Sequence, residues 1–328
     1  MLHIHNGDST ANTMREAAFP GEHFAFREAL VSGPTRQGLS QDEWLELRAT
    51  HLAGEGEPEA AAIKQDLARM DATLANSFDH EEVILWFEHD LFCQINLIHL
   101  LDRFARQGVG SSRLSLICIG EFPGKPNFKG LGELTAVQMA SLFDTRHAVT
   151  AAEFSLAQKA WAAYCSPDPR DIERLLAEDT SALPFLRGAL EQHLARFPSV
   201  SNGLGHAENK LLGFIADGNN KFGSLCPAFF NAEPAYGLGD LQIWCDLKRM
   251  AEAAQPLIEL EGAADATGAD SLLHTVCRIT ETGRRVLAGQ ADFVRLNGID
   301  LWLGGVHLRA DNLWRWDEQR QALAQASA

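Results

Sequence analysis

The first twelve residues constrain the fold of this chain more than any other segment. They read Met-Leu-His-Ile-His-Asn-Gly-Asp-Ser-Thr-Ala-Asn, an alternating apolar stretch that runs into a Gly-Asp-Ser turn and then a helical pattern. Residues 2–6 predict a β-strand, because their side chains alternate between two faces with period two. A strand that ends in such a turn and feeds a helix is how an open α/β sheet presents polar groups to a ligand.

Three further apolar segments predict the rest of this sheet. Residues 23–28, 82–88 and 114–119 read as strands, and residues 10–18, 40–52, 58–76 and 91–107 read as the helices between them. Ser40 and Glu43 have the spacing of a capping box, and Asp90 stands where an N-cap of the last helix would be. Strands alternating with helices predict a small, mostly parallel, doubly wound α/β sheet with right-handed crossovers.

The rest of the sequence shows two further patterns of predicted secondary structure. Helical patterns alone occupy residues 133–143, 151–165, 169–178 and 183–196; three more helices at 207–216, 222–230 and 237–254 are followed by two short strands at 256–260 and 274–279. Three helices and a two-stranded wing resemble a winged-helix domain. Because 328 residues exceed the size of one typical core, we expect an α/β domain over 1–150, a helical connector over 151–198 and a winged-helix-like α+β domain over 199–328.

Composition excludes several classes of function. The six cysteines include no Cys-x-x-Cys pair, which disfavours a thiolate zinc site and fits a reducing compartment. There is no signal-peptide pattern and no apolar run of about 18 residues, so we expect a cytoplasmic protein without a membrane partner. The formal net charge of −16 repels nucleic-acid phosphates and disfavours non-specific nucleic-acid binding.

Polar residues and turn glycines follow all four predicted strands. They are Asn6, Gly7, Asp8 and Ser9 after the first strand, Glu28 and Gly33 after the second, Glu88, His89 and Asp90 after the third, and Glu121 after the fourth. Ligands of open parallel sheets bind beyond the carboxyl ends of the strands, and the amides of a helix start favour an anion. We therefore expect these residues to converge on a small polar or phosphorylated ligand. One glycine in the first turn, where dinucleotide folds have three, disfavours a nicotinamide cofactor.

Two alternatives make the same crevice a hydrolase site. The Gly-Asp-Ser turn resembles the opening block of the Gly-Asp-Ser-Leu hydrolases, with Thr10 in place of leucine, so Ser9 is a candidate nucleophile and His147 of Asp144-Thr-Arg-His147 a candidate base. His89 and Asp90 are the other candidate catalytic groups. Alternatively, the carboxylates, above all Asp8, Glu88 and Asp90, hold a divalent cation such as Mg²⁺ for phosphoryl hydrolysis. As helix caps or solvated strand ends, the same residues need no ligand.

The pair His3 and His5 has the spacing of the His-x-His ligands of strand-one metallohydrolases, because alternate residues share a face. His89 is the single later candidate for such a set. A structural role for the pair is therefore favoured.

The winged-helix-like segment is expected to contact a partner. Its presumed recognition helix, residues 239–250, carries Asp240, Asp246, Lys248 and Arg249, which is no phosphate-binding stripe. A protein contact or structural support is therefore at least as compatible with this segment as DNA reading, and a DNA-binding regulator is the third hypothesis.

Four stretches together look like a known family. They are His-Ile-His-Asn-Gly-Asp-Ser at 3–9, Val-Ser-Gly-Pro at 31–34, Val-Ile-Leu-Trp-Phe-Glu-His-Asp-Leu-Phe-Cys-Gln at 83–94, and Asn-Gly-Ile-Asp-Leu-Trp-Leu-Gly-Gly-Val-His at 297–307. In this combination the chain resembles bacterial proteins that carry the domain of unknown function 1835. The resemblance spans nearly the whole chain but implies no activity and no residue roles.

Overall fold

The structure is a computed structural model that describes residues 1–54, 57–108, 113–262 and 272–325. It divides into two compact units. Unit 1 consists of Met1–Leu190 with Gly304–Val306, and unit 2 consists of Glu191–Leu303 with His307–Ala328.

Unit 1 is built on a five-stranded sheet of order β2-β1-β4-β5-β6. Strands β1 (Leu2–His5), β2 (Glu22–Ala25), β4 (Val83–Glu88) and β5 (Leu114–Ile119) are parallel, and the two-residue β6 (His147–Ala148) runs antiparallel to β5. The predicted mostly parallel α/β sheet is confirmed.

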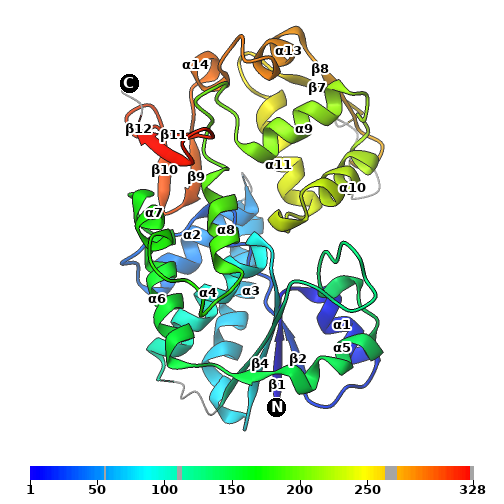
Figure 1. Ribbon diagram of the computed structural model, residues 1–328, viewed down its shortest axis with the longest axis vertical. Helices are drawn as coiled ribbons and strands as arrows, with labels where there is room; N and C mark the ends of the chain where they lie inside the picture. The colour runs from blue at the N-terminus through cyan, green and yellow to red at the C-terminus, as the bar shows by residue number, and fades with distance from the viewer. Residues whose placement is uncertain (55–56, 109–112, 263–271, 326–328) are drawn as a thin grey trace. The chain divides into compact units, whose positions relative to one another are not determined.

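Helices cover both faces of this sheet (Figure 1). Helix α1 (Asp8–Glu16) follows β1, α2 (Gln41–Ala53) and α3 (Glu57–Ala75) connect β2 to β4, and α4 (Leu91–Arg106) connects β4 to β5. In Figure 1, α1 and α5 (Ala136–Ser141) lie on one side of the sheet and α3, α4 and α6 (Ala151–Tyr164) on the other. The strand order reverses direction between β1 and β4, which is the topological switch point of a doubly wound sheet.

The predicted helix starts are also confirmed at two places. Ser40 and Glu43 form a capping box at α2, and the Asp90 carboxylate caps α4 by accepting from the Cys93 amide at 2.8 Å. On the α1 side of the sheet, Trp86 is fully buried in one apolar cluster with Met14 and Met139. On the other side Leu85 and Phe87 are fully buried.

Helices α7 (Arg170–Leu176) and α8 (Leu186–Leu194) lead toward unit 2 along the chain. Unit 2 then contains α9 (His206–Ala216), α10 (Phe222–Ala232) and α11 (Asp240–Ala251), followed by the antiparallel pair β7 (Ile258–Glu261) and β8 (Val276–Ile279). Helices α13 (Glu281–Leu287) and α14 (Phe293–Asn297) come next, and after β9 (Leu301–Gly304) and β10 (Val306–Leu308) the chain forms a second antiparallel pair, β11 (Trp314–Asp317) and β12 (Ala322–Gln325).

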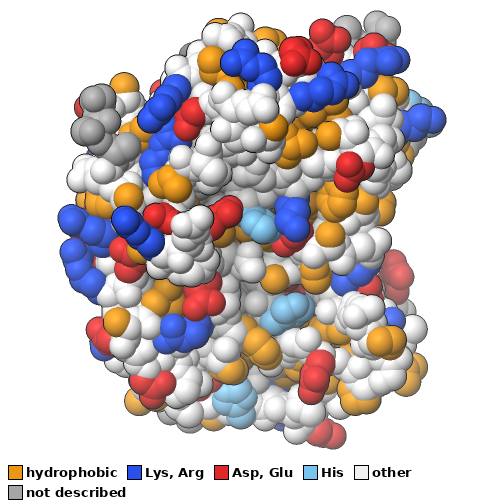
Figure 2. Space-filling model, turned by 45° about the horizontal axis from the view of Figure 1, so that its top comes forward, with side chains coloured by type: hydrophobic (Ala, Val, Ile, Leu, Met, Phe, Trp, Pro, Cys, Tyr) orange, Lys and Arg blue, Asp and Glu red, His pale blue; other side chains and the backbone are white. Residues whose placement is uncertain are grey.

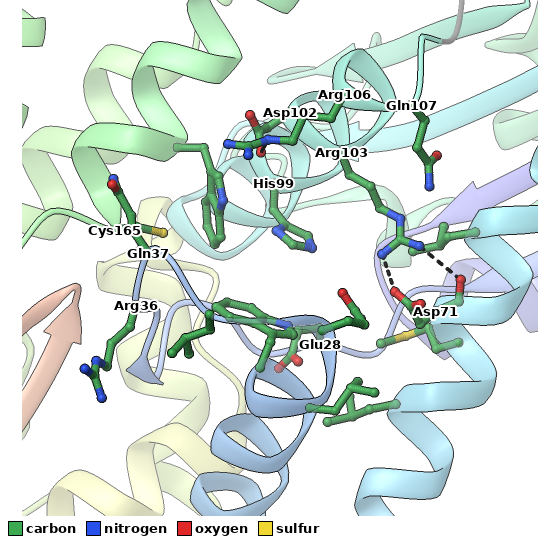
Figure 3. A pocket seen from close by; sticks show the side chains of 18 of the residues that line it. Glu28, Arg36, Gln37, Asp71, His99, Asp102, Arg103, Arg106, Gln107 and Cys165 are labelled. Atoms are coloured by element: carbon green, nitrogen blue, oxygen red, sulfur yellow. Dashed lines mark hydrogen bonds and ion pairs between the residues drawn. The ribbon is translucent and has the colours of Figure 1, made fainter.

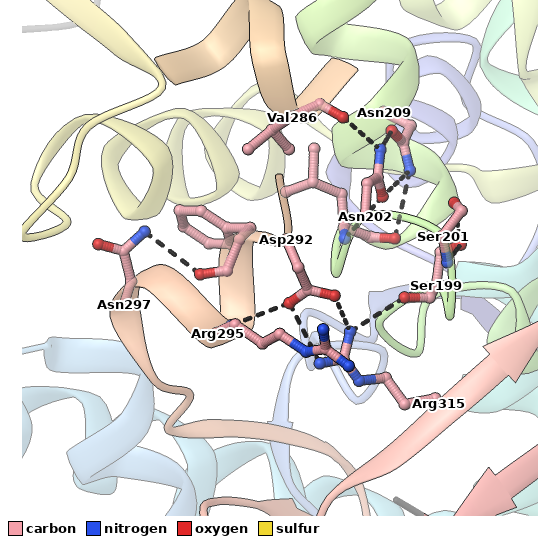
Figure 4. Close-up of polar contacts among 11 residues, drawn as sticks. Ser199, Ser201, Asn202, Asn209, Val286, Asp292, Arg295, Asn297 and Arg315 are labelled. Carbon is pink, nitrogen blue, oxygen red and sulfur yellow. Dashed lines mark hydrogen bonds and ion pairs between the residues drawn. The ribbon is translucent and has the colours of Figure 1, made fainter. Parts of the chain in front are cut away.

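A polar network fixes the loop that precedes α9 (Figure 4). The Arg315 guanidinium donates to the Asp292 carboxylate at 2.7 Å and to the Ser199 carbonyl oxygen at 3.1 Å. Asn202 donates to the Asn209 side chain at 2.7 Å. Since the Arg315 and Asp292 side chains are 9% and 13% exposed, this ion pair is largely removed from water and links β11 to the start of α14.

None of the helices in the described part of the chain combines the length and apolar character needed to cross a membrane.

Candidate functional site

The structure brings the predicted strand-end residues of β1 and β4 together. Asn6 follows β1 and donates to Cys93 Sγ at 2.7 Å. The Cys93 thiol lies 3.4 Å from Glu88 Oε1, to which it donates. Oxygens of Glu88 and Asp90 and the Cys93 sulfur all lie within 4.8 Å of one another. The convergence at the carboxyl edge therefore exists between these strands, around a cysteine that the sequence reasoning did not single out.

This acidic cluster is closed by the chain itself. The loop after β5 crosses the carboxyl edge, and the Leu131 amide donates to Glu88 Oε2. Leu131 and Phe128 pack with Trp86 in the core. Gly130 permits the approach, since a β-carbon there would lie 2.7 Å from Glu88 Oε1. The predicted crevice is thus filled near Glu88 by the protein's own backbone.

Burial controls the charge of this cluster. It raises the pKa of Glu88, an effect that the neighbouring Asp90 charge increases, and it raises the pKa of Asp90 despite the amides that the carboxylate caps. Burial also holds the pKa of the Cys93 thiol well above its usual range. These directions disfavour a thiolate at Cys93 and favour a proton on the carboxyl pair.

Asp8 does not join that cluster. Its carboxylate forms a bidentate ion pair with Arg27, with both nitrogen–oxygen distances at 2.7 Å, and the hydrogen bonds from Arg27 lower the pKa of Asp8. The predicted cation site of Asp8, Glu88 and Asp90 is therefore not assembled: Cys93 takes the place of Asp8 beside the other two carboxylates.

Ser9 lies in the first turn of α1, after the N-cap Gly7 with φ of 103°. Its side chain is exposed, and a β-carbon at Gly132 would lie 3.5 Å from Ser9 Oγ. The proposed base does not reach it. His147 pairs with Leu116 on the far side of β5 and contacts Glu153 Oε1 at 2.7 Å, and β1 is three strands away, about 14 Å at the usual strand spacing.

The other predicted residues have different surroundings. Glu28 lies three residues beyond the end of β2, which stops earlier than predicted, and its buried carboxylate accepts from Arg48 at 2.8 Å. Gly33, with φ of 74°, packs against the ring of His51, so it serves a close approach of backbone to α2. His89 is half-buried beside Phe128 and Phe185, and burial lowers its pKa. Glu121 is exposed.

His3 and His5 belong to a neutral histidine cluster with His23. Trp86 Nε1 donates to His3 Nδ1, and His5 Nε2 lies 3.0 Å from His23 Nδ1. The outer nitrogens Nε2 of His3 and His23 donate to the carbonyl oxygens of Pro20 and Phe19. Each ring thus donates through Nε2 as a neutral imidazole, and burial lowers the pKa of His3 to about 4 and of His5 to about 2. The structural role favoured for the pair agrees with these contacts.

A large cavity lies elsewhere in unit 1, among α2, α3, α4 and α6 (Figure 3). Its volume of about 490 Å³ is in the range of small-molecule sites. The aromatic part of its wall comes from Phe26, Trp44, His99 and Trp161. The Trp44 and His99 rings are stacked with centroids 5.9 Å apart, and Trp161 meets His99 edge to face at 4.7 Å.

Polar groups without partners line the same cavity. His99 is partly buried, and its Nδ1 has no hydrogen-bond partner among the described residues, which is also true of Arg103 Nε. Burial lowers the pKa of His99 to about 3, so the ring is neutral and offers one donor and one acceptor. Figure 3 shows His99 and Arg103 reaching into the space between the helices, with the Arg36 guanidinium directed away from it. Buried polar atoms of this kind are costly unless a ligand or water pairs with them.

The sequence reasoning missed this cavity because its wall is assembled from helices and from residues 36–39 before α2, which are separated in the sequence. Only Glu28 belongs both to the predicted site and to the cavity wall. The available signal was the presence of Trp44, His99 and Trp161 on predicted helices, a pattern that by itself indicates core packing.

No protein-family model matches the chain, and no curated protein is similar to it. The resemblance to the domain of unknown function 1835 therefore stays a prediction.

Proposed function

We propose that unit 1 is a ligand-binding α/β domain that holds a small polar molecule in the cavity between α2, α3, α4 and α6. The observation that carries the proposal is a 490 Å³ space whose wall combines the Trp44 and Trp161 rings with polar side chains such as Glu28 and Gln107. The polar side chains would supply hydrogen bonds to a ligand, and the aromatic wall would supply apolar contact area. The proposed class of function is the one expected from the sequence. The proposed site, however, lies among α2, α3, α4 and α6 and not at the strand ends.

The strand-end alternatives are less well supported by the geometry. A serine nucleophile needs a base within hydrogen-bond reach, and the predicted His147 is three strands away. A Mg²⁺ site needs accessible carboxylate oxygens, whereas Glu88 and Asp90 accept from backbone amides and from Cys93. We therefore rank hydrolysis at Ser9 or at a metal below ligand binding.

The test uses ¹⁹F NMR of a fluorinated fragment library with the full chain. Ala162 lies in the cavity wall on α6 and its side chain is exposed there, so Ala162→Trp should fill the entrance and remove the fragment signals that the wild type broadens. Ala152→Trp, on the exposed face of the same helix, is the matched control and should bind as the wild type does. Fragments that bind equally to both variants would contradict the proposal.

We also propose a winged-helix-like arrangement for α9 to β8, with a protein partner. An isolated bridge joins Lys221, just before α10, to Val276 of β8, as the first strand of a winged helix pairs with its wing. On α11, Leu241 is 62% exposed, whereas the Arg249 side chain is 24% exposed and pairs with Glu208. An apolar exposed residue and an arginine engaged in an ion pair favour a protein surface over DNA.

The charges in view support the same preference. Figure 2 shows lysine and arginine side chains interleaved with acidic ones on the face displayed. We therefore expect no retention of a mixed-sequence DNA duplex at about 150 mM salt in fluorescence anisotropy, and saturable binding with a steep salt dependence would favour the DNA-binding regulator instead. All six cysteines are free thiols, which suits the cytoplasmic location that we propose.

A further inference from the structure

We infer that the cavity between α2, α3, α4 and α6 takes a planar nitrogen heterocycle with ring N–H donors and carbonyl or ring-nitrogen acceptors, of the kind found in purine bases. This inference rests on the proposed function, because it specifies the chemical class of ligand for the same cavity.

The wall of the cavity contains several aromatic rings in contact with one another. Trp44 and His99 present stacked rings whose planes are inclined by only 11°, and Trp161 stands edge-on to His99 at 65°. His99 is stacked on Phe26 as well, with centroids 6.1 Å apart, so these rings form an aromatic wall with Trp161 as an upright neighbour. Flat rings gain most from contact with an aromatic wall, and stacking of a base on an aromatic side chain tolerates any base because each has a π-face.

Polar groups of the cavity wall are available for hydrogen bonds to a ligand. Glu28 Oε1 accepts from Arg48 and from the Ala29 amide, whereas no hydrogen bond reaches Glu28 Oε2 within the described residues. Nδ1 of the neutral His99 ring is shielded from solvent, which leaves Nε2 as its donor or acceptor. The Gln107 amide, with both a donor and an acceptor, faces the same space (Figure 3). Donors and acceptors are thus both present in this wall, which suits the edge of a heterocycle and disfavours a hydrocarbon ring.

The charged side chains of the cavity wall are paired with one another or with nearby residues. The Arg103 guanidinium pairs with Asp71, Arg106 pairs with Asp102, and Glu28 pairs with Arg48. Each carboxylate of the wall is therefore compensated by an arginine. With Arg36 directed away from the space, nothing in the interior demands an anion. The base should supply the recognition, and a phosphate should contribute little.

The experiment is isothermal titration calorimetry of the full chain with guanosine, with indole as a planar ring lacking the polar edge, and with inorganic phosphate. We expect guanosine to bind more tightly than indole by at least about tenfold, because the unpaired polar groups are then satisfied. Phosphate at millimolar concentration should neither bind in the cavity nor compete with guanosine.

Two substitutions separate the stacking from the polar edge. Trp44→Leu should weaken guanosine binding by about tenfold or more, as expected for a lost stacking contact. His99→Phe keeps a ring beside Trp44 but removes both nitrogens, so it should weaken guanosine binding and leave indole binding unchanged. Unit 2 offers a matched pair, since Trp302 and His307 are also stacked, with centroids 4.3 Å apart; Trp302→Leu and His307→Phe should leave guanosine affinity unchanged.

A substitution at an exposed position tests the inference without disturbing the core. Gln107 lies at the exposed C-terminal end of α4, and Gln107→Leu should reduce guanosine affinity about fivefold, the effect of one hydrogen bond. If fluorinated fragments bind in an Ala162-dependent manner but guanosine does not bind, the heterocycle inference is wrong and the proposed function stands. If guanosine binds but is insensitive to Trp44→Leu, His99→Phe and Gln107→Leu, the inference is also wrong. If neither fragments nor guanosine bind, both fail.

Discussion

The imidazole of His99 is stacked on the indole of Trp44, with ring centroids 5.9 Å apart and planes inclined by 11°. One residue comes from α4 and the other from α2, so the stack joins two helices that cover the same side of the sheet. The contact gives the cavity wall a rigid aromatic surface and holds an unpaired nitrogen beside it.

His99 should stay neutral over the whole physiological range. Because burial lowers its pKa to about 3, guanosine affinity should be constant between pH 5 and pH 8 in calorimetry. Two-dimensional ¹H–¹⁵N NMR of the imidazole should show a neutral tautomer at pH 5. A protonated ring at that pH, or an affinity that changes tenfold over this interval, would contradict the assigned polar edge.

The histidine cluster of β1 and β2 should make the protein sensitive to acid. The pKa values of His3 and His5 are lowered by burial, so the unfolded chain binds more protons than the native one below pH 6.5. The contribution of these histidines to the free energy of unfolding is fully present above about pH 6.5 and is lost as the pH falls toward 4. Between pH 7 and pH 5 the loss is about 2 kcal/mol for each histidine that stays neutral in the native state. Urea unfolding at the two pH values measures the loss. His5→Phe should reduce it, whereas His147→Gln, at an exposed site, should not.

Glu88 should make the stability of the protein fall with rising pH, which is opposite to the effect of the histidines. Its raised pKa means that the native state holds a proton that the unfolded state has released, so stability contributed by this group falls as the pH rises above about 4.5. Glu88→Gln should therefore flatten the decline of the unfolding temperature between pH 6 and pH 9, and Glu121→Gln, at an exposed strand end, should leave the decline unchanged. If millimolar Mg²⁺ raised the unfolding temperature of the wild type but not of Glu88→Gln, the cation alternative would gain support over a shared proton.

The ion pair in unit 2 should be a stability determinant. Arg315→Ala leaves the Asp292 carboxylate largely buried without its partner, which costs about 3–5 kcal/mol in comparable sites. Arg309→Ala removes an exposed pair with Asp311 and should cost less than about 1 kcal/mol. Equal losses for the two variants in denaturant unfolding would show that Arg315 is solvated in solution.

The sequence predicted the sheet well because local signals and burial agree there. Residues 83–87, within the predicted strand 82–88, are an uninterrupted apolar run, which is typical of a parallel strand buried on both faces. Asp90 before residues 91–107 marks a helix start. The end of β2 was placed too late, at Glu28. That carboxylate is drawn into an ion pair with Arg48 of the following helix, a tertiary contact that no local pattern encodes.

The candidate site was harder to predict than the fold. Strand topology correctly placed Asn6 and Glu88 at one edge of the sheet, but it carries no information on whether a later loop covers that edge, as residues 128–131 do. Ser9 and His147 follow the order of a hydrolase along the chain, yet the order along the chain does not fix the distance between them. Trp44 and His99 belong to helices far apart in sequence, and their meeting depends on helix packing.

A crystallographic soak of the wild-type protein with guanosine and with the fragments identified by ¹⁹F NMR would locate the ligand itself. We expect electron density for a planar ring against Trp44, with polar edge atoms within hydrogen-bond distance of His99 and Glu28. Density found only at other surfaces, with the cavity occupied by ordered water or closed by rearranged tryptophans, would contradict the proposal.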